Sequence, residues 1–148
     1  MHNTKVDLAR KARLMAVQDE YSNIMSGQLP EQVAQLLSNS KFSSEQKKFI
    51  EDKYNQIKAI VEQHRKQIDA LIKKYSKERP FDQLNPIDIA ILRVAIAEGF
   101  IGRLVPVKVA INEAVRIAKR YSTANAYKFI NGVLGNILRK EKAFKDLT

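Results

Sequence analysis

The sequence predicts an all-α protein, and three observations support that prediction. Glycine and proline are scarce, with five and four residues in a chain of 148. Apolar residues recur at the three- and four-residue steps of a helix, and no stretch sustains the alternation of a strand. The stretch from Asn85 to Phe100 is apolar in nearly every direction around a helix. A helix of that kind is buried, so we expect the rest of the chain to be organised around it.

Composition limits the classes of protein to which the chain can belong. Its length fits one domain, or two small subdomains that share a core. It has no cysteine, which excludes a disulfide framework and a thiolate metal site. The start does not read as a signal peptide, and the apolar stretch is shorter than the roughly 20 residues that cross a bilayer. We therefore expect a cytoplasmic protein with no membrane association.

The charge of the chain favours a polyanionic partner. The formal net charge is +10 and the sequence pI is about 9.8, a balance for which nucleic acid is the first candidate. Residues 41–79 carry roughly five net positive charges and residues 101–148 roughly seven, whereas residues 80–100 are slightly acidic. The basic character therefore belongs to the outer helices and not to the buried one.

The first helix is expected to begin at a cap on Asn3 or Thr4 and to run to about Ser26. Its core-facing stripe consists of apolar residues at helical spacing: Leu14, Val17, Tyr21 and Ile24.

Two arginines, Arg10 and Arg13, fall on this same stripe one to two turns earlier. Burying unpaired charge is costly, so we expect the first turns of the helix to project past the core. They would present Arg10, Lys11 and Arg13 to an anionic partner, and Gln18 would extend the patch. The alternative is a solvated helix end whose cations pair with carboxylates of the same helix.

Local signals place the next helices. Pro30 opens a short helix, and Ser43 with Gln46 forms a capping box that begins a long helical run to about Tyr75. The polar segment 62–67 favours a bend or break in that run.

The buried stretch has its own boundary signals. Asn85 caps it and Pro86 takes the first helical position, where a missing N–H costs nothing. Gly99 and Gly102 are expected to end it.

The next helix is expected to begin at Pro106 and to carry a core stripe that ends at Tyr121. One flank of this helix holds three cations and an amide at helical spacing: Lys108, Asn112, Arg116 and Lys119. Such a row suits phosphate contacts together with hydrogen bonds to base edges. A plain solvent-exposed flank gives the same pattern.

The last helix carries two glycines, Gly132 and Gly135, on the side away from its apolar stripe, together with Lys128. Each glycine costs about 1 kcal/mol relative to alanine in a helix interior. They indicate either tight packing within the fold or close approach by another backbone or a ligand. Three polar residues are candidate caps for this helix: Ser122, Thr123 and Asn125. We expect the basic tail from Arg139 to Lys145 to be frayed.

No pattern typical of an active site is present. The sequence has no glycine-rich phosphate loop, zincin helix or nucleophile elbow. His2 and His64 have neither a companion ligand at metal spacing nor a nucleophile nearby in sequence. We expect no enzymatic activity, no metal and no cofactor.

Three motifs, in this order and spacing, resemble the NusB family of bacterial transcription antitermination factors: Leu84–Val94 (LNPIDIAILRV), Val105–Ala118 (VPVKVAINEAVRIA) and Lys128–Leu134 (KFINGVL). The first helix agrees, because residues 10–13 (RKAR) and the later AVQ and Tyr21 are similar to the family's arginine-rich start. The resemblance covers nearly the whole chain. It implies about seven helices arranged as two small packed bundles in one domain, residues 1–148. The N-terminal subdomain would be about 1–79, the C-terminal subdomain 80–140 and the basic tail 141–148.

The resemblance implies binding without catalysis. NusB proteins pair with NusE, a small-subunit ribosomal protein, and the pair recognises the boxA element of leader RNA. Together they help RNA polymerase read through terminators in ribosomal RNA operons. Matching positions imply RNA contacts for Arg10, Lys11 and Arg13. Lys108, Asn112 and Lys128 lie in the matching motifs and are further RNA candidates, beside Gln18 of the patch on the first helix. Tyr21 and Asp88, the latter in an exposed opening turn of the central helix, match positions of the NusE contact.

Two other readings remain. The same domain resembles the N-terminal portion of certain ribosomal RNA cytosine methyltransferases, but this chain has no room for a methyl-donor domain. The other is a partner-binding or self-associating helical scaffold with weak or non-specific RNA binding. The short arginine run keeps this reading open, and some NusB proteins form homodimers through the face used for RNA.

Overall fold

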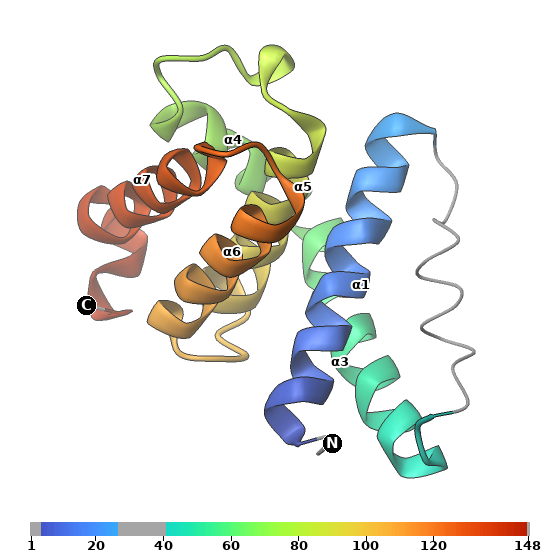
Figure 1. Cartoon of the computed structure of the whole chain (residues 1–148). Coiled ribbons are helices and arrows are strands. Elements are labelled where there is room, and N and C mark those ends of the chain that lie inside the picture. Colours follow the sequence, from blue (N-terminus) through green and yellow to red (C-terminus); the bar gives the residue numbers. More distant parts are fainter. Residues whose placement is uncertain (1–3, 27–40, 148) are drawn as a thin grey trace.

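The structure, a computed structural model, describes residues 4–26 and 41–147, and all its regular elements are helical (Figure 1). The all-α prediction is therefore confirmed for this part of the chain. Six α-helices carry the labels of Figure 1: α1 (Lys5–Met25), α3 (Ser44–Gln63), α4 (Arg65–Tyr75), α5 (Pro86–Ala95), α6 (Val107–Tyr121) and α7 (Ala126–Lys140). Three shorter segments complete them: η1 (Phe81–Gln83), the π-helix η2 (Ile96–Ile101) and η3 (Lys142–Leu147). The short helix expected from Pro30, as well as His2, lies outside the described residues.

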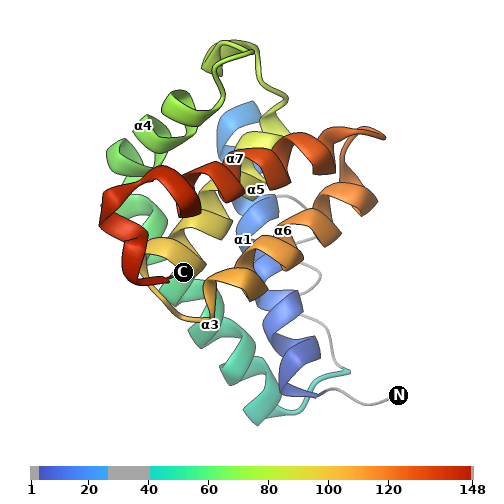
Figure 2. The same cartoon turned by 90° about the vertical axis from the view of Figure 1, so that its left-hand side faces the viewer.

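Helix α5 lies between two groups of helices (Figures 1 and 2). On one side α1 and α3 pack against each other and against α5, and on the other side α6 and α7 do the same. Helix α4 contacts α3 of the first group and α7 of the second, as well as α5, and thereby links the groups. Every residue from Asp88 to Phe100 is buried, so the predicted buried stretch is confirmed.

The hydrophobic core runs through both groups and includes side chains from all six α-helices. Met15 of α1, Ile57 of α3, Ile68 of α4 and Leu134 of α7 are among its fully buried large side chains. Within residues 4–26 and 41–147, no helix has both the length and the apolar character needed to cross a membrane.

Three helices begin where local signals predict. Thr4 and Asp7 form a reciprocal capping box on α1, with Asp7 N–H donating to Thr4 Oγ1 at 3.1 Å. Ser43 and Gln46 do the same for α3, at 2.9 and 3.1 Å. The Asn85 side chain accepts a hydrogen bond from the first turn of α5. Each cap satisfies a backbone donor that the helix itself leaves free.

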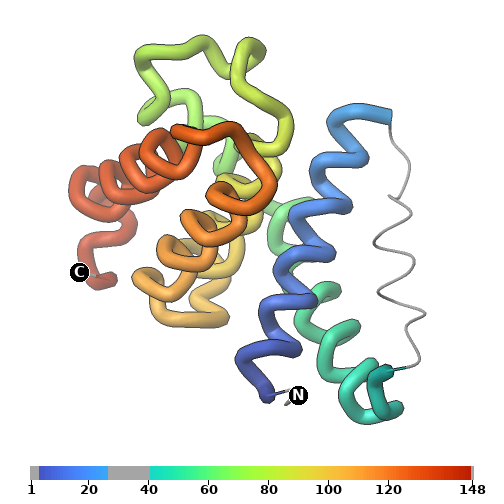
Figure 3. Tube along the Cα trace, viewed as in Figure 1, coloured from blue at the N-terminus to red at the C-terminus, as the bar shows by residue number. Residues whose placement is uncertain are grey.

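The long run after Ser43 breaks within the predicted polar segment. Helix α3 ends at Gln63 and α4 begins at Arg65, because His64 between them leaves the helical region with φ −115° and ψ 21°. Beyond this break the chain continues as α4, which packs against α7; Figure 3 traces the chain through these segments in sequence colours.

The expectation that Gly99 ends the central helix is wrong. The backbone instead widens into η2 and continues helically to Ile101, with Gly102 following. A Cβ at Gly99 would clash with the methyl group of Ala110 in α6, and one at Gly102 would clash with Ile60 of α3. Both glycines therefore allow neighbouring helices to approach the π-turn closely.

The expectation that the basic tail is frayed is also wrong. Residues 139 and 140 still belong to α7, and η3 follows directly. Phe144 is buried and meets the Phe100 ring edge to face, with 5.3 Å between ring centroids. Arg103 and Asp146 form an ion pair beside it at 2.5 Å. This segment closes one end of the core.

Candidate nucleic-acid and partner interface

Arg13 is buried in the structure, with only 4% of its surface exposed. Its Nε lies 2.5 Å from Glu98 Oε1, and another guanidinium nitrogen lies 2.9 Å from Glu113 Oε1. The prediction that Arg13 is presented to an anionic partner is therefore wrong. The stripe of α1 buries this cation because it is paired, and the two carboxylates lie 85 and 100 residues further along the chain.

Arg10 and Lys11 remain at the surface, as predicted. Arg10 Nε donates to Glu113 Oε1 at 2.8 Å, and 37% of its side chain is exposed. Hydrogen bonding to Glu113 raises the pKa of Arg10, so its guanidinium stays charged. The Lys11 ammonium lies 5.3 Å from the centre of the Phe42 ring.

A groove of about 410 Å³ separates α1 from α6, and we call it the α1–α6 groove. Eight of its lining residues carry charge or an exposed aromatic ring: Asp7, Arg10, Lys11, Arg13, Glu113, Arg116, Arg120 and Tyr121. A shallow hollow on α6 adjoins it and adds Asn112 and Lys119. The structure thus brings Arg10 and Lys11 near the predicted flank of α6.

Arg120 is a groove residue that the sequence analysis missed. It follows Arg116 by four residues, and this spacing places both side chains on one face of a helix. This four-residue spacing in the sequence could therefore have identified Arg120 as a neighbour of Arg116 on the same face. Lys108 and Lys128 do not line the groove: Lys108 is exposed in the first turn of α6, and Lys128 lines a separate cavity next to α4.

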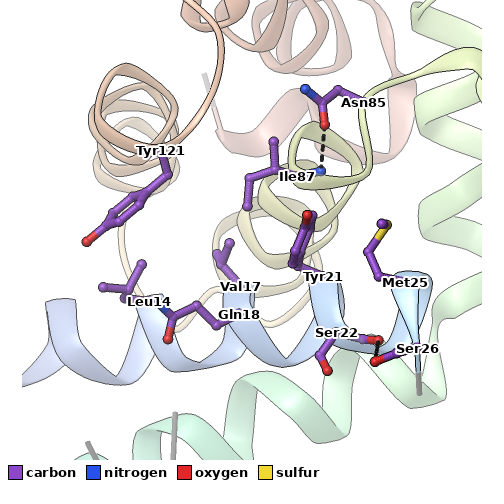
Figure 4. Close-up of a pocket in the computed structure, with 10 residues that line it drawn as sticks. All are labelled: Leu14, Val17, Gln18, Tyr21, Ser22, Met25, Ser26, Asn85, Ile87 and Tyr121. Atoms are coloured by element: carbon purple, nitrogen blue, oxygen red, sulfur yellow. Dashed lines mark hydrogen bonds between the residues drawn. The ribbon is translucent and has the colours of Figure 1, made fainter. Parts of the chain in front are cut away.

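A second hollow, which we call the Tyr21 pocket, lies between α1, the start of α5 and the end of α6 (Figure 4). Its volume is about 490 Å³. Tyr21 is 37% exposed here and Met25 is 57% exposed. Gln18 lines this pocket and not the α1–α6 groove. Its Oε1 is buried and has no hydrogen-bond partner among the described residues.

The Tyr21 pocket and the α1–α6 groove share two wall residues, Leu14 and Tyr121. Tyr121 was expected to end a core stripe, and that expectation is wrong because 43% of the residue is exposed. The Arg120 guanidinium lies 5.6 Å from the centre of its ring. The two hollows therefore form one continuous surface with an aromatic ring and a cation at their junction.

Asp88 is buried, which contradicts its expected exposure toward a partner. Only 2% of the residue is exposed, and its Oδ1 accepts a hydrogen bond of 2.6 Å from the Ser122 hydroxyl. Burial raises the pKa of the Asp88 carboxyl, while that hydrogen bond and the charge of Arg79 oppose the rise. The Ser122 hydroxyl, which directly follows α6, therefore donates to Asp88 of α5 and does not cap α7. None of the three candidate caps of α7 makes a side-chain capping bond.

The other buried carboxylates of α1 connect helices. Asp19 accepts a hydrogen bond of 3.0 Å from the Tyr54 hydroxyl of α3. Glu20 pairs with Arg65 of α4 at 2.8 Å and with Arg93 of α5 at 3.4 Å. In the part of the chain that the structure describes, no group of three or more histidine or acidic residues could hold a metal ion.

Comparison with known proteins gives consistent matches. The family model described as NusB family matches residues 9–139. A Shewanella loihica protein named transcription antitermination protein NusB is 36% identical over 133 residues, which cover 89% of this chain and 96% of the relative. A Thermoanaerobacter protein of the same name is 41% identical over 112 residues, covering 74% and 76%.

Solved structures agree in fold. The structure of Thermotoga maritima NusB superposes with a TM-score of 0.71 at 28% identity and covers 99% of this chain and 98% of its own. A chain from a structure of antitermination factors NusB and NusE in complex with dsRNA gives a TM-score of 0.69 at 20% identity, covering 94% and 97%. At that identity the second match supports the fold alone.

Arg13→Ala should lower the free energy of unfolding by about 3–5 kcal/mol, because Glu98 would remain buried without its cation. Urea unfolding followed by circular dichroism measures the loss. Arg10→Ala is the control, because Arg10 is partly exposed and Glu113 still has Arg13 as its ion-pair partner. The free energy of unfolding of this variant should fall by less than about 1 kcal/mol. Equal small losses for both variants would contradict the structural role of Arg13.

Asp88→Asn should raise the melting temperature at pH 7. The pKa of Asp88 is higher in the folded protein than the ordinary value of 3.8, so the ionised carboxylate disfavours folding. That penalty is absent below the unfolded pKa and develops as pH rises through the folded pKa. Asparagine keeps an oxygen that can accept the bond from Ser122. The stability gap, measured by thermal unfolding, should close as the buffer is acidified below about pH 4; a gap independent of pH would contradict this account.

Proposed function

The chain belongs to the NusB family, and on that basis we propose that it is a bacterial transcription antitermination factor. It binds boxA-type leader RNA together with NusE and supports read-through by RNA polymerase in ribosomal RNA operons. The proposed role is binding and not catalysis. It places the protein in the cytoplasm, within the antitermination complex of RNA polymerase.

The observation that supports RNA binding is the grouping of cations along the α1–α6 groove. Arg10 comes from α1, while Arg116 and Arg120 come from α6. Guanidinium groups suit phosphate because their donors match phosphate oxygens in pairs. The nearby Glu113 carboxylate already has Arg13 and Arg10 as partners, so its charge is compensated within the protein.

Tyr121 supports a single-stranded segment as the RNA ligand. Its ring is exposed at the end of the groove, next to the Arg120 guanidinium. Unstacked bases of single-stranded RNA bind by stacking on aromatic rings, whereas bases within a duplex are already stacked. Cations followed by an exposed ring therefore favour an unpaired strand.

The Tyr21 pocket is the surface that we assign to NusE. Tyr21, Met25 and Tyr121 give it an exposed apolar and aromatic rim. Aromatic residues and methionine are enriched in the cores of protein interfaces. Since the pocket adjoins the groove, a partner seated there lies beside the bound RNA. A second copy of this chain is the alternative occupant of this rim, in a self-associating scaffold.

Replacing Arg116 and Arg120 together with alanine should weaken binding of a boxA oligonucleotide at least tenfold. Two lost phosphate contacts should also reduce the slope of log affinity against log salt by about 1.4. Fluorescence anisotropy across a salt series measures both quantities, with scrambled RNA as the specificity control. Lys48→Ala with Lys66→Ala removes the same charge from exposed positions on α3 and α4 and should change the affinity far less. Equal losses of RNA affinity in the two double variants would show that generic electrostatic attraction, and not the α1–α6 groove, binds the RNA.

Tyr21→Ala should weaken NusE binding by about 2 kcal/mol, roughly thirtyfold, as expected for a central aromatic side chain of an interface. Calorimetric titration with NusE measures the affinity. Val109→Ala is the control, because Val109 is an exposed apolar residue of α6 that does not line the pocket. Wild-type NusE affinity in Tyr21→Ala, together with loss of a homodimer in sedimentation, would favour the scaffold instead.

A further inference from the structure

Met25 places a thioether at the rim of the Tyr21 pocket, where solvent reaches it. It is the last residue of α1, and 57% of it is exposed. Met15, the other methionine that the structure describes, is fully buried in the core. The third methionine of the chain, Met1, lies outside the described residues. Within residues 4–26 and 41–147, an oxidant dissolved in water therefore meets methionine sulfur at Met25.

Methionine carries all the sulfur chemistry of this protein. The chain has no cysteine, so thiol oxidation and disulfide formation are excluded. A thiol must first lose its proton to become a nucleophile, whereas a thioether has no proton to lose and needs no cationic neighbour to activate it. Oxidation of a methionine in this chain is therefore governed by access to its sulfur.

The surroundings of Met25 are apolar and uncharged. Five large apolar or aromatic residues are exposed in the described part of the chain, and three of them, Tyr21, Met25 and Tyr121, line this one pocket. Figure 4 shows Tyr21 and Met25 on α1, both pointing toward Ile87 at the start of α5. None of the ten lining residues carries a charge, although the net charge of the chain is +10. Gathered apolar groups of this kind mark an interaction surface, and a polar group at Met25 would change it.

Met25 is separate from both the core and the α1–α6 groove. It belongs neither to the hydrophobic core of the described residues nor to the side chains packed against that core. It does not line the groove. Leu14, which the groove and the pocket share, lies about 16 Å away along α1 at the rise of a helix. A chemical change at Met25 therefore acts on the pocket and leaves the fold and the groove intact.

We propose that Met25 is an oxidation switch of the Tyr21 pocket: a hydroperoxide converts its thioether to the sulfoxide, and the sulfoxide weakens partner binding. The sulfur lone pair attacks one peroxide oxygen, so that an S–O bond forms and the O–O bond breaks. The proton of the attacked oxygen passes to the other oxygen, which departs as water or an alcohol. Sulfur is oxidised by two electrons and the peroxide is reduced by two. The site of oxidation follows from exposure, while its effect on NusE rests on the proposed function.

The sulfoxide is polar where the thioether is apolar. A partner that covers the rim takes the new oxygen out of water, and burying a polar group without a hydrogen-bond partner costs free energy. The expected loss of affinity is about tenfold. The converse also holds, because a bound partner shields the sulfur of Met25 from the oxidant.

Peptide mass spectrometry maps the reaction on the folded chain. After brief treatment with hydrogen peroxide and removal of the peroxide by catalase, Met25 should be oxidised well before Met15. Saturating NusE, present during the treatment, should slow oxidation of Met25. Equal rates at Met25 and Met15 would contradict the assignment of the site.

Calorimetric titration with untreated NusE measures the effect on binding. Oxidised wild-type protein should bind NusE about tenfold more weakly, and a methionine sulfoxide reductase should restore the affinity. Met25→Leu keeps an apolar side chain, so peroxide should not change its NusE affinity. Met25→Gln imitates the polarity of the sulfoxide and should bind weakly without peroxide. Affinity for a boxA oligonucleotide in the absence of NusE, and the melting temperature, should stay at wild-type values in all these proteins.

The outcomes separate the switch from the proposed function. If untreated protein fails to bind NusE, the proposed function is wrong and the switch falls with it. If it binds NusE, and oxidation at Met25 leaves that affinity unchanged, the switch alone is wrong. An equal loss of NusE affinity in peroxide-treated Met25→Leu would assign the sensitivity to another residue and overturn the proposal.

Discussion

The ion-pair cluster that joins Arg13 to Glu98 and Glu113 is the constraint on which the surface of the protein depends. It connects α1 to η2 and to α6 inside the protein, with all three residues buried. A buried cation is tolerated only where its partners are held in good geometry, so the cluster fixes α1 against α6. Those two helices form the walls of the basic groove. Glu113 also holds Arg10 at its rim, and the buried cluster thereby positions a surface cation.

Local signals explain why much of the fold could be predicted. The caps at Thr4, Ser43 and Asn85 depend on residues two or three positions apart, and such pairs are visible in the sequence. The burial of α5 followed from its composition. The expectation that Gly99 ends the central helix is wrong because glycine is needed there for the close approach of Ala110 in a later helix. No local sequence pattern shows that contact.

The candidate surface was predictable only in part, for the same reason. Arg10, Lys11 and Asn112 lie at or beside the groove, and the spacing of Arg120 from Arg116 was visible but unused. The roles of Arg13 and Asp88 were wrong because their partners come from distant segments of the chain. Long-range pairing turned residues that looked like exposed charges into parts of the interior.

The packing of Phe144 against Phe100 has a consequence for synthesis on the ribosome. The central helix and η2 emerge when α1 and α3 are already available to cover one side of them. The other side waits for α6, α7 and finally Phe144, which closes the end of the core. Uncovered apolar surface in partly folded chains promotes aggregation, so the nascent chain carries its most apolar segment through a vulnerable interval. That interval ends only when nearly all the described residues have been made.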